Sequence, residues 1–253
     1  MIKSILWDVD GTLAETERDG HLKAFNQAFE ALGLSWRWSE QRYAELLAVA
    51  GGRERVLHDM QCRGGAPGDR QQRQALADRV HRLKNELYAR IVAGGALPLR
   101  EGVRELLDDC ETAHLQLGIV TTTSRSNVEV LLKTHLGKDW ESKFAAVVCA
   151  QEAPKKKPHP QAYLLALDAL KLRPHEAVAL EDAQAGIAAA QAAGVPVIVT
   201  RSHYFAATDS QGALAVGPSL GRTDGWHPAA GRGTTRIGLE QIIQWYACSP
   251  WAP

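Results

Sequence analysis

The feature that most constrains the fold is an alternation of short apolar runs with segments of helical period. Strand-like runs lie at 2–7, 115–120, 145–150, 177–180 and 195–200, with a shorter one at 213–216. Most of them are separated by segments with the apolar spacing of a helix, at 103–110, 126–135, 161–170 and 183–193. Parallel strands need long crossover connections, which are usually helices. The pattern therefore predicts an α/β fold, a doubly wound parallel sheet covered by helices.

One long stretch between the first two predicted strands has almost no strand signal. It is rich in helix formers, and helical patterns lie at 21–32, 40–49 and 70–92. A segment of this size is too long for an ordinary connection within a compact domain. We therefore predict an inserted helical domain over 15–97, with the core domain formed by 1–14 and 98–253.

Other signals mark the ends of these units. Glycines and a proline at 93–103 predict the hinge through which the chain returns to the core. A last helix is expected at 237–246.

Trp36 and Trp38 are a residue pair that could stack with nucleic-acid bases. No basic excess surrounds them, so we expect them to pack between helices of the insertion.

Charge and composition exclude several classes of partner. The chain has 29 basic and 29 acidic residues, so no overall field attracts nucleic acid or an anionic membrane. The four cysteines are scattered, without the spacing of a zinc site or a disulfide framework. No apolar stretch approaches the length of about 18 residues needed to span a membrane. We expect a cytoplasmic protein, a monomer or a weak dimer, that recognises a small molecule.

Polar side chains cluster at the ends of the predicted strands or directly after them. They are the acids Asp8 and Asp10, the hydroxyls Thr121, Thr122, Thr123 and Ser124, the lysines Lys155, Lys156 and Lys157, and the acids Glu181 and Asp182. Ligands of open α/β sheets bind beyond the carboxyl ends of the strands, so these groups should converge. Carboxylates hold Mg²⁺ through oxygen, while lysine and hydroxyl groups take phosphate oxygens. The combined site suits a divalent cation and a phosphoryl group.

These strand-end residues, taken in order, also form known motifs. Asp8-x-Asp10-Gly-Thr, Thr122, Lys157-Pro and Glu181-Asp182 resemble the four motifs of the haloacid dehalogenase-like (HAD) phosphotransferase superfamily. The resemblance covers nearly the whole chain. It implies a Rossmann-like core and identifies the helical insertion with the mobile cap of that superfamily.

The resemblance implies a role for each core residue. Asp8 would be the nucleophile that forms an aspartyl-phosphate, and Asp10 the general acid and base. Thr122 would bind a phosphoryl oxygen, and Lys157 would neutralise charge on Asp8 and the phosphate. Asp182 would bind Mg²⁺ with Asp8 and the backbone carbonyl of Asp10. Glu181 beside it would be a ligand or hold a water.

Some of these residue types have plain structural interpretations as well. Strand propensity and helix capping account for one of Thr121 and Thr123, which leaves Thr123 and Ser124 as candidates for substrate binding. Lys155 and Lys156 fit a solvated charge run. One departure from the superfamily's pattern is Ala183, where relatives usually carry a small hydroxyl residue after the Glu-Asp pair.

The insertion should carry the specificity. Its "GGRER" motif places Arg53 and Arg55 after two glycines, a pair that could clamp a second phosphate, although composition alone favours a solvated helix face. The motifs "DVDGTLAETE", "GGRER", "TTTSRSNV" and "ALEDA" are similar to those of CbbY-type phosphatases, which act on xylulose-1,5-bisphosphate, an inhibitor of Rubisco. That likeness implies that Glu17 and His21 face the sugar hydroxyls and both arginines face the distal phosphate. Tyr43 would help to close the site. We expect the other eight histidines to lie outside it.

The resulting hypothesis is a Mg²⁺-dependent phosphatase of a sugar bisphosphate, first of all xylulose-1,5-bisphosphate. A β-phosphoglucomutase-like isomerase would use the same core. A phosphonate hydrolase would need a Schiff-base lysine in the cap, for which Lys23 is a candidate by type alone. A dehalogenase would not need Asp10. A catalytically silent sugar-phosphate-binding protein is the alternative from another class.

Overall fold

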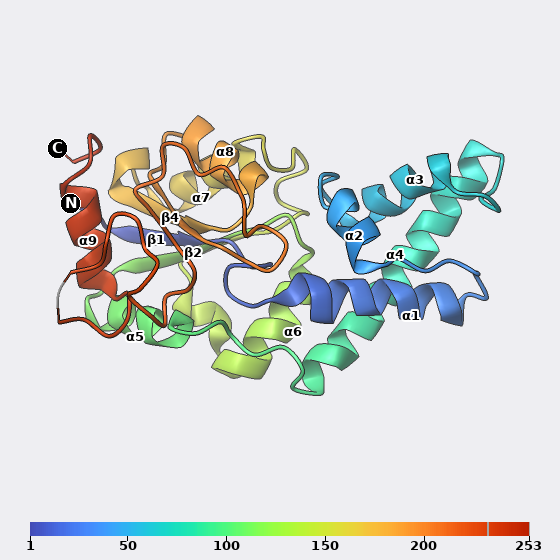
Figure 1. The fold of residues 1–253 in the computed structure, drawn as a ribbon, viewed down its shortest axis with the longest axis horizontal. Coiled ribbons are helices and arrows are strands. Elements are labelled where there is room, and N and C mark those ends of the chain that lie inside the picture. Colours follow the sequence, from blue (N-terminus) through green and yellow to red (C-terminus); the bar gives the residue numbers. More distant parts are fainter. Residues whose placement is uncertain (232, 253) are drawn as a thin grey trace.

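The computed structural model describes residues 1–231 and 233–252, and it contains a parallel sheet with helices on both faces beside a helical lobe (Figure 1). The sheet has six strands in the order β3-β2-β1-β4-β5-β6, and all neighbouring pairs are parallel. The strands are β1 (Ser4–Trp7), β2 (Gln116–Val120), β3 (Ala146–Val148), β4 (Ala177–Glu181), β5 (Val197–Thr200) and β6 (Ala215–Gly217). The predicted fold class is confirmed.

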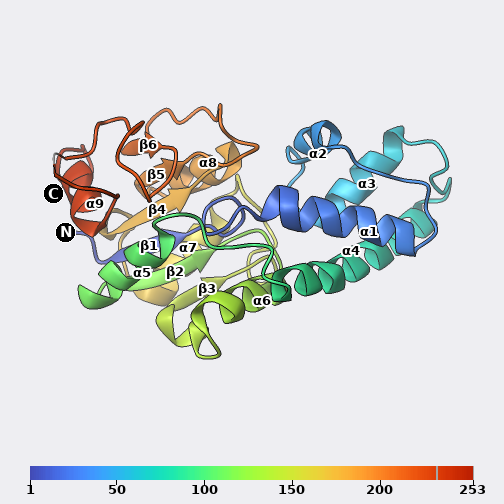
Figure 2. The same ribbon diagram turned by 60° about the horizontal axis from the view of Figure 1, so that its bottom comes forward.

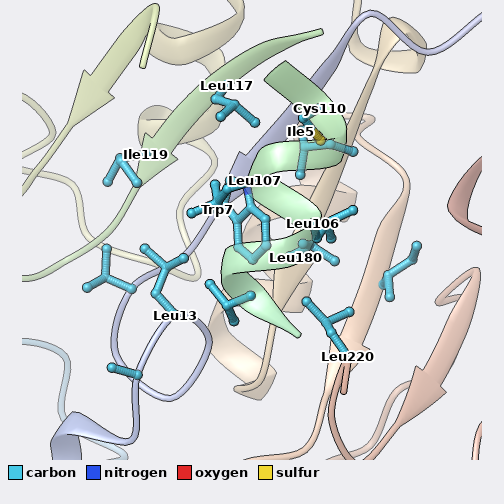
Figure 3. Packing of buried hydrophobic residues seen from close by; sticks show 14 of the residues in the cluster. Ile5, Trp7, Leu13, Leu106, Leu107, Cys110, Leu117, Ile119, Leu180 and Leu220 are labelled. Atoms are coloured by element: carbon cyan, nitrogen blue, oxygen red, sulfur yellow. The ribbon is translucent and has the colours of Figure 1, made fainter. Parts of the chain in front are cut away.

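Both faces of the sheet are apolar, as the continuous apolar runs of its strands require. Successive residues of β1 show this directly: Ile5 and Trp7 belong to one buried cluster, and Leu6 belongs to another. Figure 3 shows Trp7 surrounded by aliphatic side chains of the first cluster. The helices outside the insertion that supply this first cluster are α5 (Val103–Thr112), α6 (Arg125–Leu136) and α9 (Leu239–Ala247). The second face is covered by α7 (Gln161–Leu170) and α8 (Gln184–Ala192).

The helical lobe lies in the sequence between β1 and β2 and extends away from the sheet (Figure 2). It consists of the π-helix η1 (Glu17–Leu22) and the α-helices α1 (Lys23–Ala31), α2 (Glu40–Leu46), α3 (Gly52–Cys62) and α4 (Arg70–Ala93). Three of these helices match predicted helical segments, whereas α3 was expected only as the helix face that composition favours for Arg53 and Arg55. Short 3₁₀ helices, η2 (Trp140–Lys143) and η3 (Pro174–Glu176), lie in the core.

The lobe has its own aromatic centre, in which Trp36 and Trp38 pack as predicted. Trp38 is almost fully buried against Phe25 and Phe29. Its ring nitrogen donates to the carboxylate of Asp59 at 2.7 Å. The lobe therefore buries an apolar cluster separate from the two that cover the sheet.

Two chain segments join the lobe to the core, and they lie side by side. An isolated β-bridge pairs Ala14 with Leu99, and the Arg100 amide donates to the carbonyl of Leu13 at 2.8 Å. The Arg100 guanidinium donates to the carbonyl of Gly11. The outgoing and returning segments are thus tied together directly beside the first strand-end motif.

Two further sequence expectations concern the whole chain. All four cysteines are free thiols, in agreement with a spacing that fits no disulfide framework. Within 1–231 and 233–252, no helix combines the length and the apolarity needed to cross a membrane.

Candidate active site

A cavity of about 420 Å³ lies where the carboxyl ends of the strands meet the helical lobe. This volume is within the range of about 300 to 1,000 Å³ that is usual for small-molecule sites. All but one of the predicted site residues line it: Asp8, Asp10, Glu17, His21, Arg53, Arg55, Thr122, Thr123, Ser124, Lys157, Glu181 and Asp182. The exception is Tyr43. The strand ends therefore converge as the topology requires.

Three buried acids form a cluster that could hold a metal ion. Asp8, Glu181 and Asp182 each offer an oxygen, and these oxygens lie within 4.8 Å of one another. Gly11 makes the close approach possible: its φ is +86°, and a Cβ at this position would lie 2.0 Å from Asp182 Oδ2. An all-oxygen set of carboxylates fits a hard divalent cation such as Mg²⁺.

Lys157 neutralises part of this acidic cluster. Its ammonium donates to Asp8 Oδ1, Glu181 Oε1 and the Val120 carbonyl, each at 2.7 Å. Burial would lower the pKa of Lys157, but the charges of Asp8 and Glu181 raise it above its ordinary value. Tyr163, a residue that the sequence analysis did not single out, donates to the same Glu181 oxygen at 2.5 Å.

Two acids of the cluster, Asp8 and Asp182, resist ionisation. Burial raises the pKa of Asp8 to about 8, with Lys157 opposing the shift and Glu181 adding to it. Burial and the charge of Asp8 raise the pKa of Asp182 well above its usual range. Crowded, desolvated carboxylates of this kind are stabilised when a cation joins them.

Asp10 has a different environment from Asp8, although only one residue separates them. His21 Nε2 lies 3.0 Å from Asp10 Oδ1, and the Thr16 hydroxyl donates to the same oxygen at 2.5 Å. Burial raises the pKa of Asp10, but His21 and Thr16 outweigh it and bring the pKa below its ordinary value. His21 itself is buried and stacks on Tyr88 at 4.3 Å between ring centroids. The pKa values of Asp8 and Asp10 are thus shifted in opposite directions, as is common for acid and base pairs.

All four members of the hydroxyl cluster after β2 line the cavity, and Thr121 also has a structural role. The Thr121 hydroxyl accepts from the Thr123 amide at 3.2 Å, so it organises the turn. Thr122, Thr123 and Ser124 line the cavity. Asn127, on the first turn of α6, donates to the Thr123 hydroxyl at 3.3 Å.

The predicted residues of the lobe divide into two groups. Arg55 is mostly buried, 3.6 Å from Glu17 and 3.2 Å from the Tyr43 hydroxyl, which donates to Glu17. Arg53 lines the cavity but its guanidinium pairs with Asp78 on α4. Arg53 and Arg55 therefore do not form one clamp in this state.

Tyr43 lies behind the cavity wall and is not among the residues that line the cavity. The side chain is fully buried and packs against Phe25 and Trp38 in the centre of the lobe. Only its hydroxyl reaches toward the cavity, through Glu17. The large ring gains more by burial in this cluster than by exposure in a polar cavity.

Helix α4 supplies two cavity residues that the sequence analysis missed. His81 lines the cavity, so the expectation that every histidine except His21 lies outside is wrong. Burial and nearby Lys84 lower the pKa of His81 to about 4. Burial lowers the pKa of Lys84 to about 8, and its ammonium lies over the rings of Phe25 and Tyr88. Their three-residue spacing places them on one side of the helix, and Lys84 lies in the same buried row as Val80 and Tyr88. An apolar row of this kind predicts packing against the lobe, so it does not mark the two residues as part of a cavity.

Two segments of the core also contribute unpredicted contacts. Lys156 was expected in a solvated charge run, yet it lines the cavity and pairs with Glu54 of α3 at 2.7 Å. After β5, the Ser202 hydroxyl donates to Asp182 Oδ2 at 2.6 Å, and Phe205 lines the cavity. No motif in the sequence marks Ser202 or Phe205.

Comparisons with known proteins agree with this geometry. A family model described as haloacid dehalogenase-like hydrolase matches residues 2–194. The CbbY protein of Cupriavidus necator (plasmid) is 42% identical over 220 residues, which are 87% of this chain and 86% of that protein.

Solved structures give the same result. The crystal structure of CbbY from Rhodobacter sphaeroides in complex with phosphate has a TM-score of 0.81 and 38% identity, and the match covers 87% of this chain and 95% of that one. A mutant of the same protein, crystallised in complex with xylulose-(1,5)bisphosphate, matches with a TM-score of 0.81, 37% identity and the same coverage.

Proposed function

Because this chain belongs to the haloacid dehalogenase-like hydrolases and is a CbbY-like phosphatase, we propose that it is a Mg²⁺-dependent enzyme that dephosphorylates xylulose-1,5-bisphosphate. The observation that carries this proposal is the convergence of Asp8, Lys157 and Asp182 beneath a cavity that basic residues of the lobe also line. Such a site offers a nucleophile and positive charge for one phosphate and further cationic groups for a second.

In the first half-reaction, a carboxylate oxygen of Asp8 attacks phosphorus in line. The bond from phosphorus to the sugar oxygen breaks, and that oxygen takes a proton from Asp10. His21 and Thr16 lower the pKa of Asp10 and so favour its ionised form. A bound phosphate dianion repels that negative charge and raises the pKa of Asp10, which makes it a proton donor only when substrate is present.

In the second half-reaction, water attacks the phosphorus of the aspartyl-phosphate. Asp10, now ionised, takes the proton of the water, and the Asp8 carboxylate is released with inorganic phosphate. His21 holds Asp10 in place through its contact of 3.0 Å in both steps. Two carboxyls with separate environments are needed because one attacks phosphorus while the other moves protons.

Charge on the transferring group is balanced by groups of the core. Lys157 already contacts Asp8 and faces the negative charge that gathers there and on the phosphate. Thr122, which lines the cavity after β2, donates to a phosphoryl oxygen. Mg²⁺ would be held by Asp8, Asp182 and the backbone carbonyl of Asp10, where it would supply further charge neutralisation. Glu181, which accepts from Lys157 and Tyr163, holds the lysine in position.

We further propose that residues 15–97 form a cap domain that selects the substrate. Glu17 and His21 line the cavity from η1, where they can meet sugar hydroxyls. Arg55 is oriented by Glu17 toward the same space. Closure of such a cap over the core excludes water from the reaction.

Release of inorganic phosphate by the purified protein tests the proposal. Xylulose-1,5-bisphosphate, ribulose-1,5-bisphosphate and β-glucose-1-phosphate are compared side by side, with Mg²⁺ and with EDTA, and Asp8→Asn serves as the inactive control. We expect a Mg²⁺-dependent preference for the xylulose compound. Equal rates on all three esters would contradict the substrate, and undiminished rates in EDTA would contradict the metal. Full activity of Asp8→Asn would contradict the nucleophile.

A further inference from the structure

The turn that follows β5, Ser202–Phe205, brings aromatic side chains of the core to the cavity and the lobe. It lies outside the four strand-end motifs, and none of the roles described above involves Tyr204 or Phe205. Phe205 lines the cavity, and both aromatic residues pack against the apolar cluster of the lobe. The turn is thus a place where core and lobe meet.

Three residues of the turn, His203, Tyr204 and Phe205, contact the lobe or the segment leading to it. The ring of Tyr204 lies edge-on to that of Tyr43, with 5.8 Å between centroids. The amide of His203 donates to the carboxylate of Glu15 at 3.3 Å, and its ring lies 3.6 Å from Glu40 of α2. The hydroxyl of Tyr43 donates to Glu17, which lines the cavity. Tyr43 therefore connects Tyr204 to the cavity wall.

The turn is also fixed firmly to the core. The Arg201 guanidinium donates to the Ala206 carbonyl at 2.7 Å, and the Thr208 amide donates to the Phe205 carbonyl at 3.1 Å. At its start, Ser202 donates to Asp182 at 2.6 Å. A braced turn presents its side chains in one arrangement, so little ordering is needed when the lobe or a ligand meets them.

Phe205 adds the ring of a phenylalanine to a cavity that many charged and hydroxylated side chains line together with small apolar residues and Leu47. The carbon chain of a sugar phosphate can lie against such a surface, while water gains no hydrogen bond from it. A small ester that reaches only the phosphoryl site beside Asp8 would not need this wall.

We propose that Tyr204 and Phe205 are specificity-determining residues that select sugar phosphates over small esters. Tyr204 docks the lobe on the core through Tyr43, and Phe205 covers the carbon chain of the substrate when the lobe is docked. This inference rests on the proposed function, because it assumes that a sugar phosphate occupies the cavity.

The test compares Tyr204→Ala and Phe205→Ala with wild type. The conservative Tyr204→Phe keeps the ring against Tyr43, and Ile243→Ala on α9 is a control outside the cavity. For each protein, kcat and KM are measured with p-nitrophenyl phosphate and with whichever sugar phosphate of the panel above wild type prefers. The quantity of interest is the ratio of the two kcat/KM values.

We expect both alanine variants to lower this ratio by about tenfold, mainly through a higher KM for the sugar phosphate. Tyr204→Phe and Ile243→Ala should keep the wild-type ratio. Activity on p-nitrophenyl phosphate shows that each variant is folded. An unchanged ratio in the alanine variants, or equal losses on both esters, would overturn the inference. A wild-type preference for another sugar phosphate would contradict the proposed substrate, and the variants would still decide the role of the turn.

Discussion

At the scale of single residues, the account depends on the contrast between Asp8 and Asp10. Both are acids at the end of β1, but Asp8 faces Glu181 and Lys157, while Asp10 faces His21 and Thr16. The pKa of Asp8 rises to about 8 without a metal, and that of Asp10 falls below its ordinary value. Environment, rather than residue type, gives two carboxyls two tasks.

The distal phosphate provides a prediction at the same scale. Arg53→Ala should lower kcat/KM for xylulose-1,5-bisphosphate by about 10-fold to 100-fold, the value of a hydrogen bond to a charged group, and change p-nitrophenyl phosphate turnover little. Because the guanidinium of Arg53 pairs with Asp78, Asp78→Asn is the matched control and should not lower bisphosphate turnover. Steady-state kinetics on both esters decide the matter, and equal losses in Arg53→Ala would remove this residue from phosphate recognition.

At the scale of helices and strands, the core could be predicted because its signals are local. Each strand is a short apolar run, and the end of β1 or β4 places its acids at a fixed edge of the sheet. Tyr163 and Ser202 could not be predicted, because their roles depend on distances to Glu181 and Asp182 that only the packed fold creates.

Helices α3 and α4 show why the lobe was harder to read. Helix α3 begins at Gly52, and its mostly polar sequence gives little amphipathic pattern. Helix α4 carries His81 and Lys84 toward the cavity, but other charged residues surround them in the sequence. The insertion could be recognised from its length and composition, whereas His81 and Lys84, which line the cavity from α4, could not.

Helix α4 also yields a prediction about pH. The pKa of His81 is lowered from 6.5 to about 4 by burial and by Lys84, so the unfolded chain binds this proton more readily than the native protein. Stability is therefore complete above pH 6.5 and is lost as the pH falls toward 4, by at most about 3 kcal/mol. The midpoint of thermal unfolding should change less between pH 7 and pH 5 for His81→Gln than for wild type. An equal or larger difference would contradict the burial of a neutral His81.

At the scale of the whole molecule, the cavity belongs to neither unit alone. The core supplies the carboxylates and Lys157, and the lobe supplies Glu17, His21 and Arg55. Contacts across the boundary include the Lys156 pair with Glu54. Ligands that bind at such a boundary stabilise the assembled form of the molecule.

Metal binding should therefore be visible in the stability of the whole protein. Mg²⁺ at a hundredfold excess over its Kd should stabilise the fold by about 2.7 kcal/mol and raise the midpoint of thermal unfolding by several degrees. EDTA should reverse the shift and abolish activity. Asp182→Asn should show no shift, since it removes one acid of the cluster. An equal shift in wild type and in this variant would place the metal elsewhere.

The most direct test of the central claim, an aspartyl-phosphate on Asp8, uses the Asp10→Asn variant with p-nitrophenyl phosphate and Mg²⁺. The p-nitrophenolate group of this ester leaves without a proton donor, so the first half-reaction does not need Asp10. Attack of water on the intermediate still needs a base, so the phosphoenzyme should accumulate. After acid quenching, mass spectrometry of the peptides should find one phosphoryl group on Asp8 and a matching burst of phenolate. A phosphoryl group on another residue, or no burst and an unmodified Asp8, would contradict the account.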